Sequence, residues 1–205
     1  MTLKLNGSSS GYTAIDAPAA AGSNTLVLPA DNGSANEVLK SDGSGNLDWV
    51  AQGSGLFSAY ALIEDQKSSG TQGGTAETGA WRTRDLNTEV ADAGSIVSIA
   101  SNQFTLQAGT YLIKWRAPAY NVDNHRSRLA DTTNTAYWYG SNEFQTAEND
   151  MSNSFGAVRV TISGAAVFEI QHQVLTTANS MGFGVAWSTL GVIETYTAVE
   201  IYKEA

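Results

Sequence analysis

Three consecutive aromatic residues are the strongest candidate for binding chemistry in this chain. Tyr137, Trp138 and Tyr139 are followed closely by Ser141 and Asn142. Successive side chains of a strand point to opposite faces, so three consecutive rings cannot all face one core. At least one ring must point outward, and outward rings beside amides and hydroxyls are typical of sites for sugars or protein partners. The alternative is that the outward ring fills a subunit interface.

A second candidate combines a tryptophan with two arginines at the end of a run rich in Gly and Thr. The sequence GTQGG at 70–74 lacks the Lys and the following helix of a phosphate-binding loop, so a nucleotide site is disfavoured. We expect a long loop and then a strand over 79–86, with Trp81 as an anchor in the core. Arg82 and Arg84 share one face of that strand. We expect them to pair with acidic side chains within or between subunits.

The two histidines do not form a catalytic or metal-binding pattern. His125 lies in the polar segment 121–126, which we interpret as a loop, and with Asn124 it is a candidate receptor or interface residue. His172 lies in an alternating stretch and is expected to be a hydrogen-bonded residue of a sheet. No His-x-His spacing is present, and no nucleophile elbow between a strand and a helix supports a serine nucleophile. No catalytic residue, metal or cofactor is therefore predicted, although paired carboxylates for glycoside hydrolysis stay open.

Composition excludes several classes of function. Asp and Glu number 20 against 11 Lys and Arg, giving a net charge of −9, which argues against binding to nucleic acid or to an anionic membrane. Cysteine is absent, so disulfides and thiolate chemistry are excluded. The uncharged run 94–113 alternates with polar residues and is not a transmembrane helix. No signal peptide is visible, so we expect synthesis in a host cytoplasm.

From residue 56 onward, apolar residues recur at every second position, which predicts strands. The alternating segments are 111–116, 158–162, 167–174, 181–187 and 199–202, with a further strand over 56–63 and a strand, tight turn and strand over 106–111. No segment has the apolar spacing of a helix. About eight to ten strands in this length predict an all-β fold, a β-sandwich or jelly roll.

Residues 1–55 differ in composition from the rest of the chain and form the first of two predicted domains. They are rich in Gly, Ser, Ala and Asn, with apolar islands at 12–15, 25–29, 38–39 and 47–50. The cluster Asp42–Asp48 offers oxygen atoms but does not match a calcium loop, and a hairpin turn explains it better. The islands are too short and too far apart to close a core within one chain. We therefore expect short strands that pack against other chains.

Residues 1–50 resemble connector segments of bacteriophage tail fibres, notably those of marine and cyanobacterial phages. The resemblance rests on GSSSGYTAIDAPAAAGSNTLVLP and on NGSANEVLKSDGSGNLDWV. Residues 56–205 resemble phage fibre-head modules that are similar to C1q/TNF-like jelly rolls. GAWRTRDLNTEV, SNQFTLQAGTYLIKWRAPAY, VFEIQHQ and TAVEIYKE carry this resemblance, most strongly in FTLQAGTYLI. The resemblance implies a homotrimer with a structural or binding role rather than an enzyme.

The preferred interpretation is a virion surface protein without enzymatic activity. Residues 1–55 are an extended connector or attachment arm that contacts other virion proteins, either of the tail or of the capsid. The jelly roll, residues 56–205, is a trimeric knob that binds a host-surface glycan or protein. Two alternatives stay open: a decoration protein that stabilises the capsid, and a polysaccharide-active enzyme on a fibre.

Overall fold

A computed structural model describes residues 3–20, 22–53, 55–145, 149–187 and 191–205. Every regular element in these residues is a β-strand, which confirms the expected all-β class. The described part of the chain holds no helix long and apolar enough to span a membrane. The chain divides into two compact units, Met1–Gly53 and Ser54–Ala205, and each is described here by itself.

The first unit consists of two antiparallel hairpins. Strand β1 (Leu3–Asn6) pairs with β2 (Tyr12–Ile15), and β3 (Glu37–Ser41) pairs with β4 (Leu47–Ala51). The carboxylate of Asp42 accepts hydrogen bonds from the backbone of Ser44 and from Asn46, which confirms a hairpin turn there. The 25–29 island forms only a single bridge, from Val27 to Asn46. None of the described residues of this unit is buried, in agreement with strands that do not close a core within one chain.

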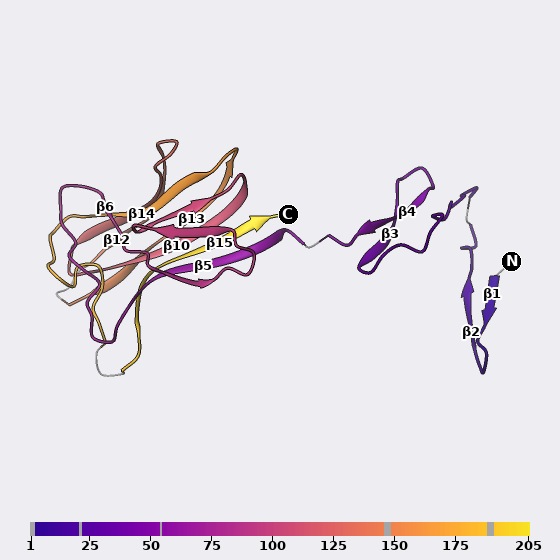
Figure 1. Ribbon diagram of the computed structural model, residues 1–205, viewed down its shortest axis with the longest axis horizontal. Coiled ribbons are helices and arrows are strands. Elements are labelled where there is room, and N and C mark those ends of the chain that lie inside the picture. Colours follow the sequence, from indigo (N-terminus) through magenta and orange to yellow (C-terminus); the bar gives the residue numbers. More distant parts are fainter. Residues whose placement is uncertain (1–2, 21, 54, 146–148, 188–190) are drawn as a thin grey trace. The chain divides into compact units, whose positions relative to one another are not determined.

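The second unit is a sandwich of two antiparallel sheets (Figure 1). In order across the first sheet lie β13 (Met151–Ile162), β10 (Gly109–Tyr120), β15 (Glu194–Glu204), β5 (Phe57–Lys67) and β7 (Thr88–Ala91). In order across the second lie β12 (Ala136–Phe144), β11 (Asn124–Asp131), β14 (Ala166–Val174), β9 (Gln103–Leu106) and β8 (Val97–Ala100), and β6 (Arg82–Thr83) pairs with β14.

The chain passes repeatedly from one sheet to the other. Strand β10 lies between β13 and β15, whereas β11 lies between β12 and β14. Consecutive strands such as β9 and β10, or β13 and β14, therefore belong to different sheets. This winding is that of a jelly roll, as expected. The tight turn at 107–108 is confirmed, but it carries the chain across the sandwich and does not close a hairpin.

The core lies between the sheets, and the alternating residues of the central strands fill it. Tyr111, Ile113 and Trp115 of β10 face Phe168 and Ile170 of β14 across the sandwich, and all five are buried. The period-two pattern therefore identified the inward face of both strands correctly. Burial of this many large side chains supplies the main favourable contribution to folding of the unit.

Two expected strands are absent or shorter than predicted. The alternating segment 181–187 forms no strand, because its glycines lack the side chains of a second face and let the backbone pack closely on residues 73–76. A Cβ atom on Gly182 would lie 2.4 Å from the carbonyl oxygen of Ala178. The strand expected over 79–86 is limited to Arg82 and Thr83. Conversely, β5 continues to Lys67, beyond the predicted end at residue 63.

Gly156 makes room for the indole of Trp115, its partner across β13 and β10. A methyl group on Gly156 would sit 2.0 Å from Cζ2 of Trp115, whose Nε1 donates a hydrogen bond to Ser127 Oγ 2.9 Å away. Because the indole is held in place, we expect Gly156→Ala to lower the free energy of unfolding by about 1–3 kcal/mol. Urea denaturation measures this. Gly164→Ala is the control, since its Cβ would meet no neighbouring atom; equal effects for the two variants would contradict the prediction.

Candidate functional site

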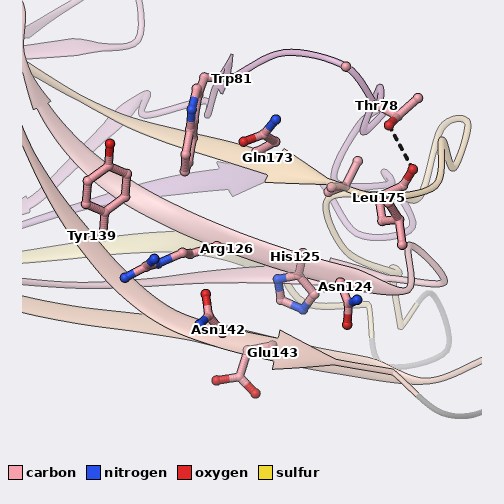
Figure 2. A pocket seen from close by; sticks show the side chains of 12 residues that line it. Thr78, Trp81, Asn124, His125, Arg126, Tyr139, Asn142, Glu143, Gln173 and Leu175 are labelled. Carbon is pink, nitrogen blue, oxygen red and sulfur yellow. Dashed lines mark hydrogen bonds between the residues drawn. The ribbon is translucent and has the colours of Figure 1, made fainter.

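A pocket of about 680 Å³ opens against the second sheet of the jelly roll (Figure 2). Strands β11, β12 and β14 supply one wall, and the segment from Thr78 to Trp81 supplies the other. Its polar lining residues are Thr78, Asn124, His125, Arg126, Asn142, Glu143 and Gln173, and its apolar ones are Trp81, Tyr139, Val174 and Leu175. Thr78 Oγ1 donates a hydrogen bond to the carbonyl oxygen of Leu175, 2.8 Å away, and so ties this segment to the end of β14.

The pocket brings together five of the predicted site residues from segments far apart in the sequence. They are Trp81, Asn124, His125, Tyr139 and Asn142. The prediction that at least one aromatic of the Tyr-Trp-Tyr run points outward is confirmed. Tyr137 and Tyr139 are 43% and 50% exposed, whereas Trp138 packs against the core. Tyr137, Trp138, Arg82 and Arg84 do not line the pocket.

Arginine and aromatic side chains alternate along the outer face of the second sheet. Cζ of Arg126 lies 4.8 Å from the ring centroid of Tyr139, and the rings of Tyr139 and Trp81 lie 5.8 Å apart. Cζ of Arg128 lies 4.1 Å from the Trp81 ring and 3.9 Å from the Tyr137 ring. Cation–π contacts of this kind fix the positions of the rings and of the guanidinium groups relative to one another. Arg126, which lines the pocket, was not predicted from the sequence, although its spacing of two from Arg128 places both arginines on one face of β11.

Trp81 is not a core anchor, contrary to the sequence prediction. Its side chain is half-buried and lies on the outer face of the sheet, between Arg128 and Tyr139. The reason is the short pairing of β6, which turns the chain inward only at Arg84 and Leu86. Both of these are buried instead. The indole is therefore available to the pocket rather than to the core.

His125 lies in a strand rather than in a loop, and it is 3% exposed. Its Nδ1 lies 2.9 Å from Nε2 of His172, and its Nε2 lies 2.8 Å from Ser152 Oγ. The expected hydrogen-bonded role of His172 in a sheet is thereby confirmed. Burial lowers the pKa of His125 to about 4, and burial together with the charge of Arg84 lowers that of His172. Both rings are neutral at pH 7.

Whether Ser152 could act as a nucleophile depends on which atoms donate in the hydrogen bonds that link His172, His125 and Ser152. Nδ1 of His172 is buried without a partner among the described residues. A buried N–H without an acceptor costs more than an unused lone pair, so we assign the proton of His172 to Nε2. His172 then donates to His125, and His125 donates to Ser152. His125 therefore does not accept the hydroxyl proton of Ser152, as a general base would have to.

Arg84 is fully buried, and it does not form the expected ion pair with any described residue. Its guanidinium donates instead to Thr197 Oγ1 and to the carbonyl oxygens of Pro118 and Phe183, at 2.8–2.9 Å. Burial lowers the pKa of Arg84 to about 9, which still leaves it charged at pH 7. Because the side chain is closed off inside one chain, it also cannot pair across a subunit boundary. Arg82 does form an ion pair, with Glu77 at 2.7 Å.

Comparison with known proteins gives matches in structure but not in sequence. No protein-family model and no curated protein sequence matches the chain. The globular domain of zebrafish complement 1qA protein is similar over 70% of this chain and 95% of its own, with 16% identity and a TM-score of 0.44. Murine APRIL at pH 8.5 is similar over 71% and 98%, with 8% identity and a TM-score of 0.42. The assignment of a jelly roll rests on the strand orders given above.

Proposed function

We propose that this chain is a non-enzymatic structural protein of a bacteriophage virion, a trimeric surface fibre whose jelly roll binds a sugar on the host. The pocket beside Trp81 and Tyr139 is the observation that carries the proposal. Sugars expose flat apolar faces that stack on aromatic rings, and hydroxyl groups that pair with amides and carboxylates. The phage origin is supported by the resemblance of residues 1–50 to fibre connectors.

The pocket supplies both kinds of contact. The rings of Trp81 and Tyr139 are tilted toward each other by 53° and offer two apolar surfaces. The amides of Asn124, Asn142 and Gln173 surround them and can both donate to and accept from sugar hydroxyls. A pocket of this size fits one or two sugar rings. Weak binding at each site gains strength when several copies engage one surface.

Exposed apolar surface supports assembly as a trimer. On the outer face of the first sheet, the ring of Tyr202 lies 5.2 Å from that of Phe57 and 5.0 Å from that of Tyr60. Phe155 on β13 is 57% exposed. In the first unit, large apolar residues are also exposed on β1 and β2. Sister chains that cover both surfaces would remove these side chains from water.

The chemistry of the pocket supports binding without turnover. Canonical glycoside hydrolysis uses two carboxylic acids that flank the bond to be broken. Among the described residues that line the pocket, Glu143 is the single carboxylate. The assigned hydrogen bonding of His125 also leaves Ser152 without a base. The proposal therefore assigns recognition to this site.

Trp81→Ala tests the proposed binding role. We expect adsorption of the protein to host cells to weaken by about tenfold or more, because an aromatic ring central to a binding site contributes more than 1.4 kcal/mol. The free energy of unfolding should fall by less than about 2 kcal/mol, since the indole is outside the core. Trp187→Ala is the matched control, because Trp187 is 68% exposed and does not line the pocket. Unchanged adsorption of the Trp81 variant would argue against the pocket.

Labelling of virions tests the location. An antibody against residues 56–205, carried on gold and viewed by electron microscopy, should mark the tail of the particle if the protein is a host-binding fibre. Label over the head would favour a decoration protein instead, and particles without the protein should then lose DNA on heating. Absence of label from all virions would exclude both and reopen the possibility of an enzyme.

A further inference from the structure

We infer that the pocket takes an acidic saccharide, a sugar such as a hexuronate whose carboxylate pairs with Arg126. This inference rests on the proposed sugar-binding function and names the class of sugar. The observation that carries it is that Arg126 lines the pocket and has no acidic partner among the described residues. Nε donates to the carbonyl oxygen of Gly140, 2.8 Å away, and the guanidinium stacks on Tyr139.

The terminal amino groups of Arg126 lack an acidic partner among the described residues. No described carboxylate lies within 4 Å of them, and the hydrogen bond to Gly140 uses only Nε. Some other cations of the same unit do form ion pairs: Lys67 with Asp65 and Asp85, and Arg159 with Glu204. Arg84 and Arg128 also lack an ion pair with a described residue, but Arg84 is fully buried and Arg128 lies between two rings, whereas Arg126 lines the pocket. The edge of the Arg126 guanidinium formed by its two terminal Nη groups is free of partners among the described residues, and it matches the geometry of a carboxylate.

The surroundings of Arg126 favour a sugar as the carrier of that carboxylate. Figure 2 shows its guanidinium beside the Tyr139 ring and Asn142, on the pocket side of β11. A ring stacked on Tyr139 or Trp81 would place a carboxylate substituent within reach of the guanidinium. Its hydroxyls would then meet Asn142 and Gln173. A small free anion would use the arginine but would leave both aromatic rings uncovered.

Glu143 is the acidic residue of the pocket, and it does not neutralise Arg126. Its Oε1 accepts a hydrogen bond from Ser141 Oγ at 2.7 Å, and it makes no ion pair with a described residue. Arg126 and Glu143 therefore both lack a charged partner among the described residues. The guanidinium of Arg126 suits the carboxylate of the sugar, whereas Glu143 can accept hydrogen bonds from its hydroxyl or amide groups.

Arg128 shows what an arginine with a purely structural role looks like on the same strand. Its guanidinium lies between the rings of Trp81 and Tyr137, and Nε donates to Gln171 Oε1 at 2.7 Å. It does not line the pocket. Arg128 is therefore a matched control for Arg126, with the same charge, the same strand and similar stacking.

Calorimetric titration of the full chain with matched oligosaccharides tests the inference. The probes are oligogalacturonate, oligomannuronate and sialyllactose, each compared with its methyl ester, which keeps the sugar and removes the charge. We expect at least one acid to bind about tenfold or more tightly than its ester, with the preference weakened by salt. Arg126→Gln should abolish this preference, whereas Arg128→Gln should retain it.

The outcomes separate this inference from the proposed function. If acids and esters bind equally, or if Arg126→Gln and Arg128→Gln behave alike, the assignment of an acidic sugar is wrong while sugar binding stands. If every acid fails to bind more tightly than its ester, the inference is likewise overturned. If no saccharide binds and Trp81→Ala leaves adsorption to host cells unchanged, the proposed function fails as well.

Discussion

Replacing Arg84 with methionine is expected to lower the free energy of unfolding by about 3–5 kcal/mol, the largest effect of any substitution considered. Arg84 connects the two sheets. Its backbone N–H donates to Ile170 in β14, while its guanidinium reaches Thr197 in β15 and Pro118 in β10. The side chain also stacks on the ring of Phe183, with Cζ 4.1 Å from the ring centroid.

Methionine fills much of the same space but donates no hydrogen bond. Two buried carbonyl oxygens, of Pro118 and Phe183, then lose their partner in a place closed to water. Each such loss costs about 1–3 kcal/mol. The buried carboxylate of Asp65 also loses a nearby positive charge that favours its ionised form. The sum of these costs gives the expected decrease in the free energy of unfolding.

Urea denaturation at one protein concentration measures the Arg84 effect, because assembly would make stability depend on concentration. Arg82→Met is the matched control. Arg82 and Glu77 form a partly exposed ion pair, so its loss should cost less than about 1 kcal/mol. A loss of similar size in both variants would show that the buried hydrogen bonds of Arg84 do not contribute the expected stability.

Acidification from pH 6.5 to pH 4 is expected to lower the free energy of unfolding by about 3 kcal/mol through His125. Burial lowers the pKa of His125 to about 4 in the folded state, against 6.5 for the exposed group. Between these values the unfolded chain binds a proton that the folded chain does not. Stability is therefore greatest above pH 6.5 and falls as the pH approaches 4. The difference between these two pKa values corresponds to about 3 kcal/mol.

Two neighbouring groups modify this dependence. The pKa of His172 is lowered by burial and by the charge of Arg84, so it acts in the same direction as His125. The pKa of Asp65 is raised by burial, so its protonation favours the folded state and opposes the loss at acid pH. The opposing effect sets in as the pH falls through the raised pKa of Asp65. The loss of stability that the histidines cause between pH 6.5 and 4 is therefore expected to be partly offset toward the acid end of this range.

Unfolding in urea at pH 7.0, 6.0 and 5.0 measures the slope. A variant with both histidines replaced by glutamine should be less stable at pH 7 but should lose most of the slope, because neither position titrates. The slope is the informative quantity, since it does not depend on the starting stability. Retention of the wild-type slope in the double variant would mean that other groups cause the acid sensitivity.

Much of the fold could be predicted from the sequence because strand patterning is local. The alternation in 111–116 and 167–174 fixed which side chains face the core, and Asp42 with its Gly-rich neighbours fixed a turn. The outward position of Tyr137 and Tyr139 followed from the same period of two. The strand predicted over 181–187 is absent, because glycines between apolar residues imitate the alternation without providing a second face of side chains.

The site itself was decided by tertiary structure. The sequence by itself determined an all-β chain, a first unit without its own core, and aromatic rings that face outward. Only the pairing of β11 with β12 and β14 brought Asn124, Asn142 and Gln173 to one pocket. Only the close packing of the sheets buried Arg84 and joined His125 to His172. Local patterns specify which face a side chain takes, whereas its neighbours depend on the register of strands far apart in the chain.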